Sequence, residues 1–207
     1  MPYPTVDEFK DALQTTSLEA LIQQHIFSGV PFVFRQRPLD SNTLVRHLRS
    51  HLPLNDDDVI IVGSAKIGFS LGPDTFPRQF SDDSDIDVAV ANQELFDMIW
   101  TTMLKWNYPR RNQLDGIDLK WVRKRMTELY WGWFRPETFR FDGLSLRTML
   151  NPLRDVSTQW FNAFQSLSHY PEFSRRTIEG RLYRSWDKAL LYHVEGLRQI
   201  KESLAAA

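Results

Sequence analysis

The chain has no cysteine among its 207 residues, so disulfide bonds and thiolate zinc sites are excluded. It also has no excess of charge: the formal net charge is −1, which gives no global attraction for nucleic acid. No apolar run approaches the length that crosses a membrane, and the first residues lack the basic-then-apolar pattern of a secretion signal. These absences predict a cytoplasmic protein without a membrane partner, and they leave its oligomeric state open.

The spacing of apolar residues predicts both strands and helices. Strands are predicted at 59–62, 86–90 and 177–183, with a short extended run at 32–34 and a long loop at 65–84. Helices are predicted to follow Thr5, Asn92 and Ser185 as caps, and to cover 18–26, 41–51 and 121–133. The pattern favours an α/β (α+β) fold, with a small mixed β-sheet flanked by helices. One domain, 1–207, is expected, with an N-terminal helical extension (1–40), a core (41–105) and a mostly helical remainder (106–207).

Two carboxylates precede the apolar part of the second predicted strand. Asp85 and Asp87 are two residues apart, so on a strand they point to the same face. Neighbouring like charges in a sheet need protons, hydrogen bonds or a cation. Mg²⁺ (or Mn²⁺) carrying the phosphates of a nucleotide is a suitable partner for two oxygen ligands. The alternative is a solvated acidic turn, because Asp82 and Asp83 come just before.

A glycine and a serine follow the first predicted strand. Gly63 allows close approach of the backbone to phosphate oxygens, and Ser64 adds a hydroxyl and an N–H group. By itself this pair is more typical of a tight turn than of a phosphate site. Combined with the two carboxylates, it indicates a nucleotide site with the acids as metal ligands.

This order of strand, Gly63-Ser64, Asp85-Ile86-Asp87 and helix resembles the DNA polymerase β-like nucleotidyltransferase superfamily over about residues 41–105. The resemblance implies a nucleotidyltransferase fold. It also implies that Asp85 and Asp87 bind catalytic Mg²⁺ (or Mn²⁺) and that Gly63 and Ser64 bind the phosphates of an NTP. The chain departs from the family pattern in one respect, because residues 65–84 make the spacing between the two motifs unusually long.

The family also supplies a third carboxylate from a later strand. Asp118, Glu179 and Asp142 are the candidates here, and Asp118 is better suited to capping the helix that follows it. Within the loop between the motifs, Lys66 is the expected nucleotide-binding cation, with Arg78 as a weaker candidate and Ser70 as a further hydroxyl.

Two basic stretches with interspersed aromatic residues are candidates for binding the molecule that accepts a nucleotide in such a reaction. Their members are Arg110, Arg111, Lys120, Arg123, Lys124 and Arg125, then Arg175, Arg176, Arg181, Arg184 and Lys188, with Trp121, Tyr130, Trp131, Trp133, Tyr183 and Trp186 among them. On one surface such residues hold RNA through phosphate contacts and stacking. The alternative is two amphipathic elements with solvated basic faces and aromatic residues in the core.

The resemblance therefore predicts an enzyme that moves an NMP from an NTP to a hydroxyl of RNA (tRNA-like), a protein or a small molecule, with release of pyrophosphate. Compact members of the superfamily include tRNA-modifying toxins and protein-modifying antitoxins, so bacterial stress or phage defence is an expected setting. The alternative is an inactive protein of the same fold that binds nucleotide or a partner protein.

Overall fold

The structure is a computed structural model that describes residues 3–110, 112, 116–139, 151–173 and 176–206. Its helices are α1 (Val6–Thr15), α2 (Leu18–Ile22), α3 (Leu39–His51), α4 (Ser64–Ile67), α5 (Gln93–Asn107), α6 (Gly116–Trp131), α7 (Asn151–Ser166) and α8 (Trp186–Ala205). Its strands are β1 (Val59–Val62), β2 (Ile86–Ala91), β3 (Trp133–Phe134) and β4 (Ile178–Tyr183). Short helical turns are η1 (Gln23–Phe27), η2 (Phe32–Phe34), η3 (Asp56–Asp58), η4 (Tyr108–Arg110), η5 (Pro136–Phe139) and η7 (Leu167–His169). The fold class is mixed α and β, as predicted.

The four strands form one mixed sheet in the order β1-β2-β4-β3. β2 runs antiparallel to β1 and parallel to β4, and β3 pairs antiparallel with β4 at the edge. The end of β1 therefore meets the start of β2, and the start of β4 lies at the same edge. This topology gathers the residues that follow β1 and those that open β2 and β4.

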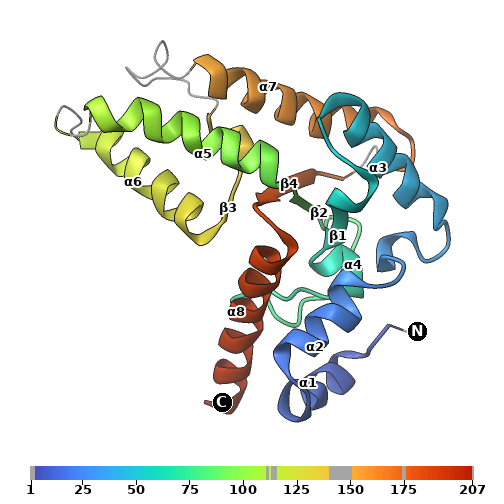
Figure 1. The fold of residues 1–207 in the computed structure, drawn as a ribbon. Coiled ribbons are helices and arrows are strands. Elements are labelled where there is room, and N and C mark those ends of the chain that lie inside the picture. Colours follow the sequence, from blue (N-terminus) through green and yellow to red (C-terminus); the bar gives the residue numbers. More distant parts are fainter. Residues whose placement is uncertain (1–2, 111, 113–115, 140–150, 174–175, 207) are drawn as a thin grey trace.

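Both faces of the sheet are covered by helices (Figure 1). Ile61, Val88 and Leu182 face one layer, which α3, α5, α6 and α7 complete with a continuous apolar core. Val62 and Ala89 face the other layer, formed by α1, α2 and α8. Because side chains alternate along a strand, Asp85 and Asp87 share the face of Ala89 and point toward the α8 side.

The structure confirms the predicted caps. The Thr5 side chain accepts from the N–H of Glu8, whose carboxylate accepts in turn from the N–H of Thr5, so α1 begins with a capping box. The Asn92 side chain accepts from the N–H of Leu95 at the start of α5. The Ser185 hydroxyl accepts from the N–H of Lys188 at the start of α8. The first predicted strand agrees with β1, and the other two agree with β2 and β4 to within one residue.

Several sequence predictions are wrong in detail. The run 32–34 is a helical turn rather than extended, and the helix predicted for 121–133 ends at Trp131 because Trp133 joins the sheet as β3. α6 begins at Gly116, so Asp118 lies inside the helix and is not its cap. Among the helices of the described residues, none has both the length and the apolar character needed to cross a bilayer.

Candidate active site

The two predicted motifs meet at one edge of the sheet. Val62, the last residue of β1, pairs with Asp87 of β2, so the turn that follows β1 begins beside the second carboxylate. Asp85 precedes β2 on the same face as Asp87. Gly63, Ser64, Asp85 and Asp87 all line one cavity of about 1020 Å³. The structure thus brings four of the five predicted site residues together.

Gly63 permits the contact between the motifs. Its φ is +66°, a backbone conformation that favours glycine, and a Cβ atom there would lie 2.7 Å from Oδ2 of Asp87. Such a distance is shorter than a real Cβ contact allows, so any side chain at this position would displace the carboxylate. Ser64 follows as the first residue of the short helix α4, in which the N–H of Lys66 donates to the carbonyl of Gly63 at 3.1 Å.

Glu179 is the third acid at this edge. It lies opposite Asp87 in the parallel pairing of β2 with β4, and it lines the same cavity. Its Oε2 accepts from Nη2 of Arg135 at 2.9 Å. Of the other two candidates for a third carboxylate, Asp142 lies outside the described residues, and Asp118 is located only by the backbone of α6. The sheet register therefore favours Glu179.

Burial and the neighbouring charges change the pKa of Asp87. Its carboxylate opens onto the cavity, but protein atoms surround it on its other sides, and this burial raises its pKa above the usual range. The positive charge of Arg181 opposes the rise, whereas the negative charges of Glu179 and Asp85 add to it. A cation that binds beside Asp87 would stabilise the charged form of this carboxylate, whose pKa is raised. The local electrostatics therefore favour binding of a cation.

The carboxylates of the cavity could hold a metal ion only if a bound phosphate group and water supply its other ligands. In the part of the chain that the structure describes, no group of three His, Cys, Asp or Glu side chains is placed to hold a metal ion. Glu179 is drawn toward Arg135, which leaves Asp85 and Asp87 as the two oxygen donors on one face. Two carboxylates suit Mg²⁺ when substrate phosphates and water fill its other positions.

The segment between the two motifs, residues 65–84, forms part of the cavity wall. The N–H of Ser70 donates to the carbonyl of Arg78 at 2.8 Å, and the N–H of Phe80 donates to that of Gly68 at 2.8 Å, so the segment turns back on itself. Ser70, Thr75 and Arg78 from this segment line the cavity. The long segment between the two motifs therefore forms part of the cavity wall.

Lys66, the fifth predicted site residue, turns away. Its side chain is buried with 4% exposure, its Nζ donates to the carbonyl of Gly29 at 2.5 Å, and it does not line the cavity. A helix rotates successive side chains by about 100°. Ser64 and Lys66 are two residues apart in the short helix α4, so they point in nearly opposite directions and cannot both face the cavity. Arg78, the weaker candidate, occupies the wall instead.

The burial of Lys66 predicts a pH dependence of stability. Burial lowers its pKa from 10.5 to about 8. Between these values the unfolded chain binds a proton that the folded chain lacks, so the free energy of unfolding rises with pH. Relative to Lys66→Met, the wild type should gain up to about 3 kcal/mol from pH 8 to pH 10.5. Denaturant titrations of both proteins measure this difference, and parallel pH curves would contradict it.

Cations and aromatic rings from β3, β4 and α8 complete the cavity. Arg181, Lys188 and Trp133 were candidates for binding the acceptor, whereas no sequence pattern marked Tyr192 or Leu191. The Arg181 guanidinium lies 4.9 Å from the centre of the Trp133 ring and 4.4 Å from that of Tyr192. Lys188, Leu191 and other α8 residues also line the cavity. Within the two basic stretches, Arg125 is buried, and Arg111 and Arg175 lie outside the described residues. Among the interspersed aromatic residues, Tyr183 belongs to the core.

In comparisons with known proteins, no family model, no curated protein and no solved structure matches this chain.

Proposed function

We propose that this protein is a metal-dependent nucleotidyltransferase with the fold of the DNA polymerase β-like superfamily. The observation that carries the proposal is the contact of the Gly63-Ser64 turn with Asp87, beside Asp85, at one edge of the sheet. Catalysis of phosphoryl transfer consists mainly of positioning and of charge stabilisation. A phosphate-binding turn next to paired carboxylates provides both.

Different residues of the cavity bind the triphosphate and the metal ion. Ser64 and its turn bind the triphosphate, and Arg78 and Lys188, which line the same cavity, offset its negative charge. Asp85 and Asp87 would hold Mg²⁺ (or Mn²⁺), which supplies electrostatic stabilisation of the non-bridging oxygens. The acceptor hydroxyl loses its proton and attacks the α-phosphorus. A bond from that oxygen to phosphorus forms, the bond to the bridging oxygen breaks, and pyrophosphate leaves.

The order of strands supports a location for the acceptor on the Glu179 side of the site. The turn after β1, Asp87 on β2 and Glu179 on β4 follow one another across the sheet. In an in-line displacement the attacking oxygen lies opposite the leaving group. With pyrophosphate on the Ser64 side, the acceptor hydroxyl is on the Glu179 side, where a carboxylate can accept its proton.

Incubation of the protein with each α-labelled NTP, Mg²⁺ or Mn²⁺, total RNA and cell lysate tests the proposal. We expect label to enter one macromolecular or small-molecule pool, with release of pyrophosphate. Calorimetry with the four NTPs identifies the preferred base. Failure of every NTP to bind or to react would contradict the proposal.

A binding protein of the same fold is the second candidate. The observation that favours it is the salt bridge of Glu179 with Arg135, which leaves only two carboxylates unpaired on the cavity face among the acids described at this edge. Metal-dependent binding of an NTP without release of pyrophosphate under any acceptor condition would select this candidate.

Glu179→Gln distinguishes the roles of the two sides of the site. We expect about a 10²-fold loss in the rate of transfer with little change in NTP affinity, because Glu179 faces the acceptor side. Glu137→Gln is the matched control, since Glu137 also pairs with Arg135 but does not line this cavity. Equal losses in both variants would show that freeing Arg135, and not removal of the Glu179 carboxylate, causes the defect.

A further inference from the structure

The outward face of α6 carries exposed cations that form no salt bridge with the residues that the structure describes. Lys120, Arg123 and Lys124 are exposed, and their i, i+3 and i+4 spacing places them on one side of the helix. Within the described residues, none of them takes part in a salt bridge. Glu128 is buried and bound to Arg125 at 2.9 Å, and the positive charge of Lys124 acts on it without forming a salt bridge. This face of α6 therefore presents positive charge to solvent.

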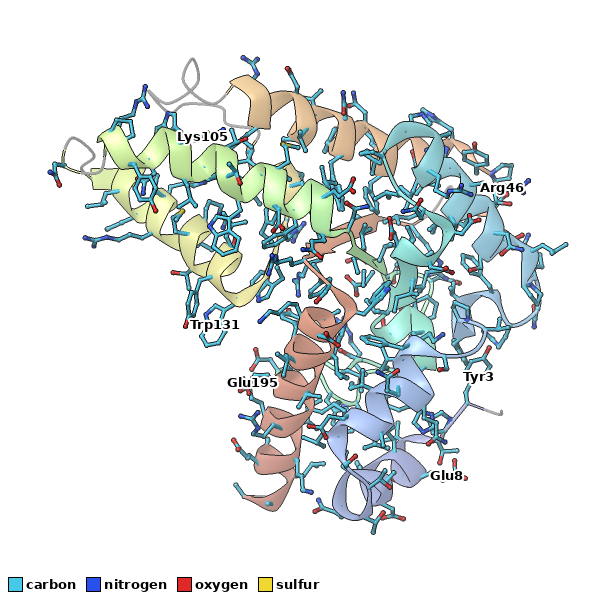
Figure 2. The ribbon with its side chains drawn as sticks, in the orientation of Figure 1. Tyr3, Glu8, Arg46, Lys105, Trp131 and Glu195 are labelled. Carbon is cyan, nitrogen blue, oxygen red and sulfur yellow. The ribbon has the colours of Figure 1, made fainter. Side chains whose placement is uncertain are left out.

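Two aromatic side chains continue this face at the end of α6. Tyr130 is 74% exposed and Trp131 is 62% exposed, and their ring centres lie 5.4 Å apart. Figure 2 shows Trp131 projecting from the last turn of α6, on the side where Glu195 projects from α8. Trp131 also lines the cavity. We name Lys120, Arg123, Lys124, Tyr130 and Trp131 the α6 track.

The α6 track leads into the candidate active site. Just after Trp131, a Cβ atom on Gly132 would lie 2.7 Å from Cγ of Lys188, so the stem of Lys188 covers the chain where α6 ends. Lys188 then lines the cavity that holds Asp85 and Asp87, as does Arg198, which pairs with Glu195 at 2.7 Å. The chain as a whole has a net charge of −1, so this run of cations is a local feature.

We propose that the α6 track binds single-stranded RNA and guides its end into the cavity as the acceptor. Lysine and arginine bind phosphates, and exposed aromatic rings stack on bases. RNA loops and ends offer unstacked bases, whereas a duplex keeps its bases stacked internally. An acidic protein would satisfy the cations but would leave Tyr130 and Trp131 without bases. This inference names the acceptor for the proposed function and rests on that function only for the reaction inside the cavity.

Fluorescence anisotropy with a labelled single-stranded RNA, without nucleotide or divalent metal, tests the binding step. We expect the Lys120→Glu/Arg123→Glu/Lys124→Glu variant to bind at least about ten-fold more weakly and to lose about 2 from the slope of log affinity against log salt. Trp131→Ala should weaken binding about ten-fold and leave that slope unchanged, because stacking is not ionic. Arg46→Glu is the matched control, since Arg46 is exposed on the opposite side of the molecule in Figure 2.

The outcomes separate this inference from the proposed function. RNA binding should persist in Asp85→Asn/Asp87→Asn, which removes the acids of the cavity and leaves the α6 track intact. Unchanged RNA affinity in both track variants would overturn the inference, as would equal losses in Arg46→Glu. Equal affinity for duplex RNA, or for an acidic peptide of the same charge, would also overturn it. Circular dichroism of each variant checks that the fold is retained.

Discussion

Replacing Asp85 and Asp87 together by asparagine should lower the rate of pyrophosphate release by about 10³-fold or more, equivalent to about 4 kcal/mol of transition-state stabilisation. Asparagine keeps the size of each side chain but removes the charge that would hold the metal. The thermal stability of the metal-free variant should not fall, because Asp87 is a carboxylate whose pKa burial and neighbouring acids raise. Release of pyrophosphate and melting temperature are measured on the same preparations.

Asp83→Asn is the matched control for this experiment. Asp83 is an exposed acid of the same turn and does not line the cavity, so its replacement should leave the rate within about two-fold of the wild type. If the double variant released pyrophosphate as fast as the wild type, the assigned site would be wrong. A loss of the same size in Asp83→Asn would point to a general effect of charge on the turn.

Gly63→Ala should lower the rate of transfer by about 10²-fold, because a methyl group 2.7 Å from Oδ2 of Asp87 displaces the carboxylate from its position. The φ of +66° adds a conformational cost of about 1–3 kcal/mol to the free energy of folding. Steady-state kinetics measures the first effect and denaturant unfolding measures the second.

Gly29→Ala separates the contact from the strain. Gly29 has a φ of +79°, but a Cβ atom there would meet nothing within 4 Å. Both alanine variants should therefore lose stability, whereas only Gly63→Ala should lose activity. Loss of activity in both would mean that backbone strain and not contact with Asp87 is responsible.

Local patterns were sufficient for the elements that carry the motifs. Short runs of β-branched residues predicted β1 and β2, and the caps at Thr5, Asn92 and Ser185 predicted where three helices begin. β3 was missed because it is two residues long and is defined only by its pairing with β4. The helix α7 was not assigned individually within the remainder of the chain.

For the site, the sequence named the paired acids and the turn because their chemistry depends on short spacing. It left the third acid open, and it favoured Lys66 over Arg78 because Lys66 is closer to Ser64 in the chain. The structure reverses that order, since Lys66 points to the carbonyl of Gly29 and Arg78 lines the cavity. Proximity along the chain does not determine which way a side chain faces.

The sequence by itself determined the mixed fold class, the strand that carries Asp85 and Asp87, and the turn at Gly63, because alternation along a strand and the freedom of glycine are local properties. Only the tertiary structure decided that Glu179 lies beside Asp87 and that Trp131 and α8 border the same cavity. These relations join segments far apart in the chain, through the parallel pairing of β2 with β4 and the antiparallel pairing of β3 with β4. A local pattern does not specify which strands pair, because pairing depends on packing between segments that are distant in the sequence.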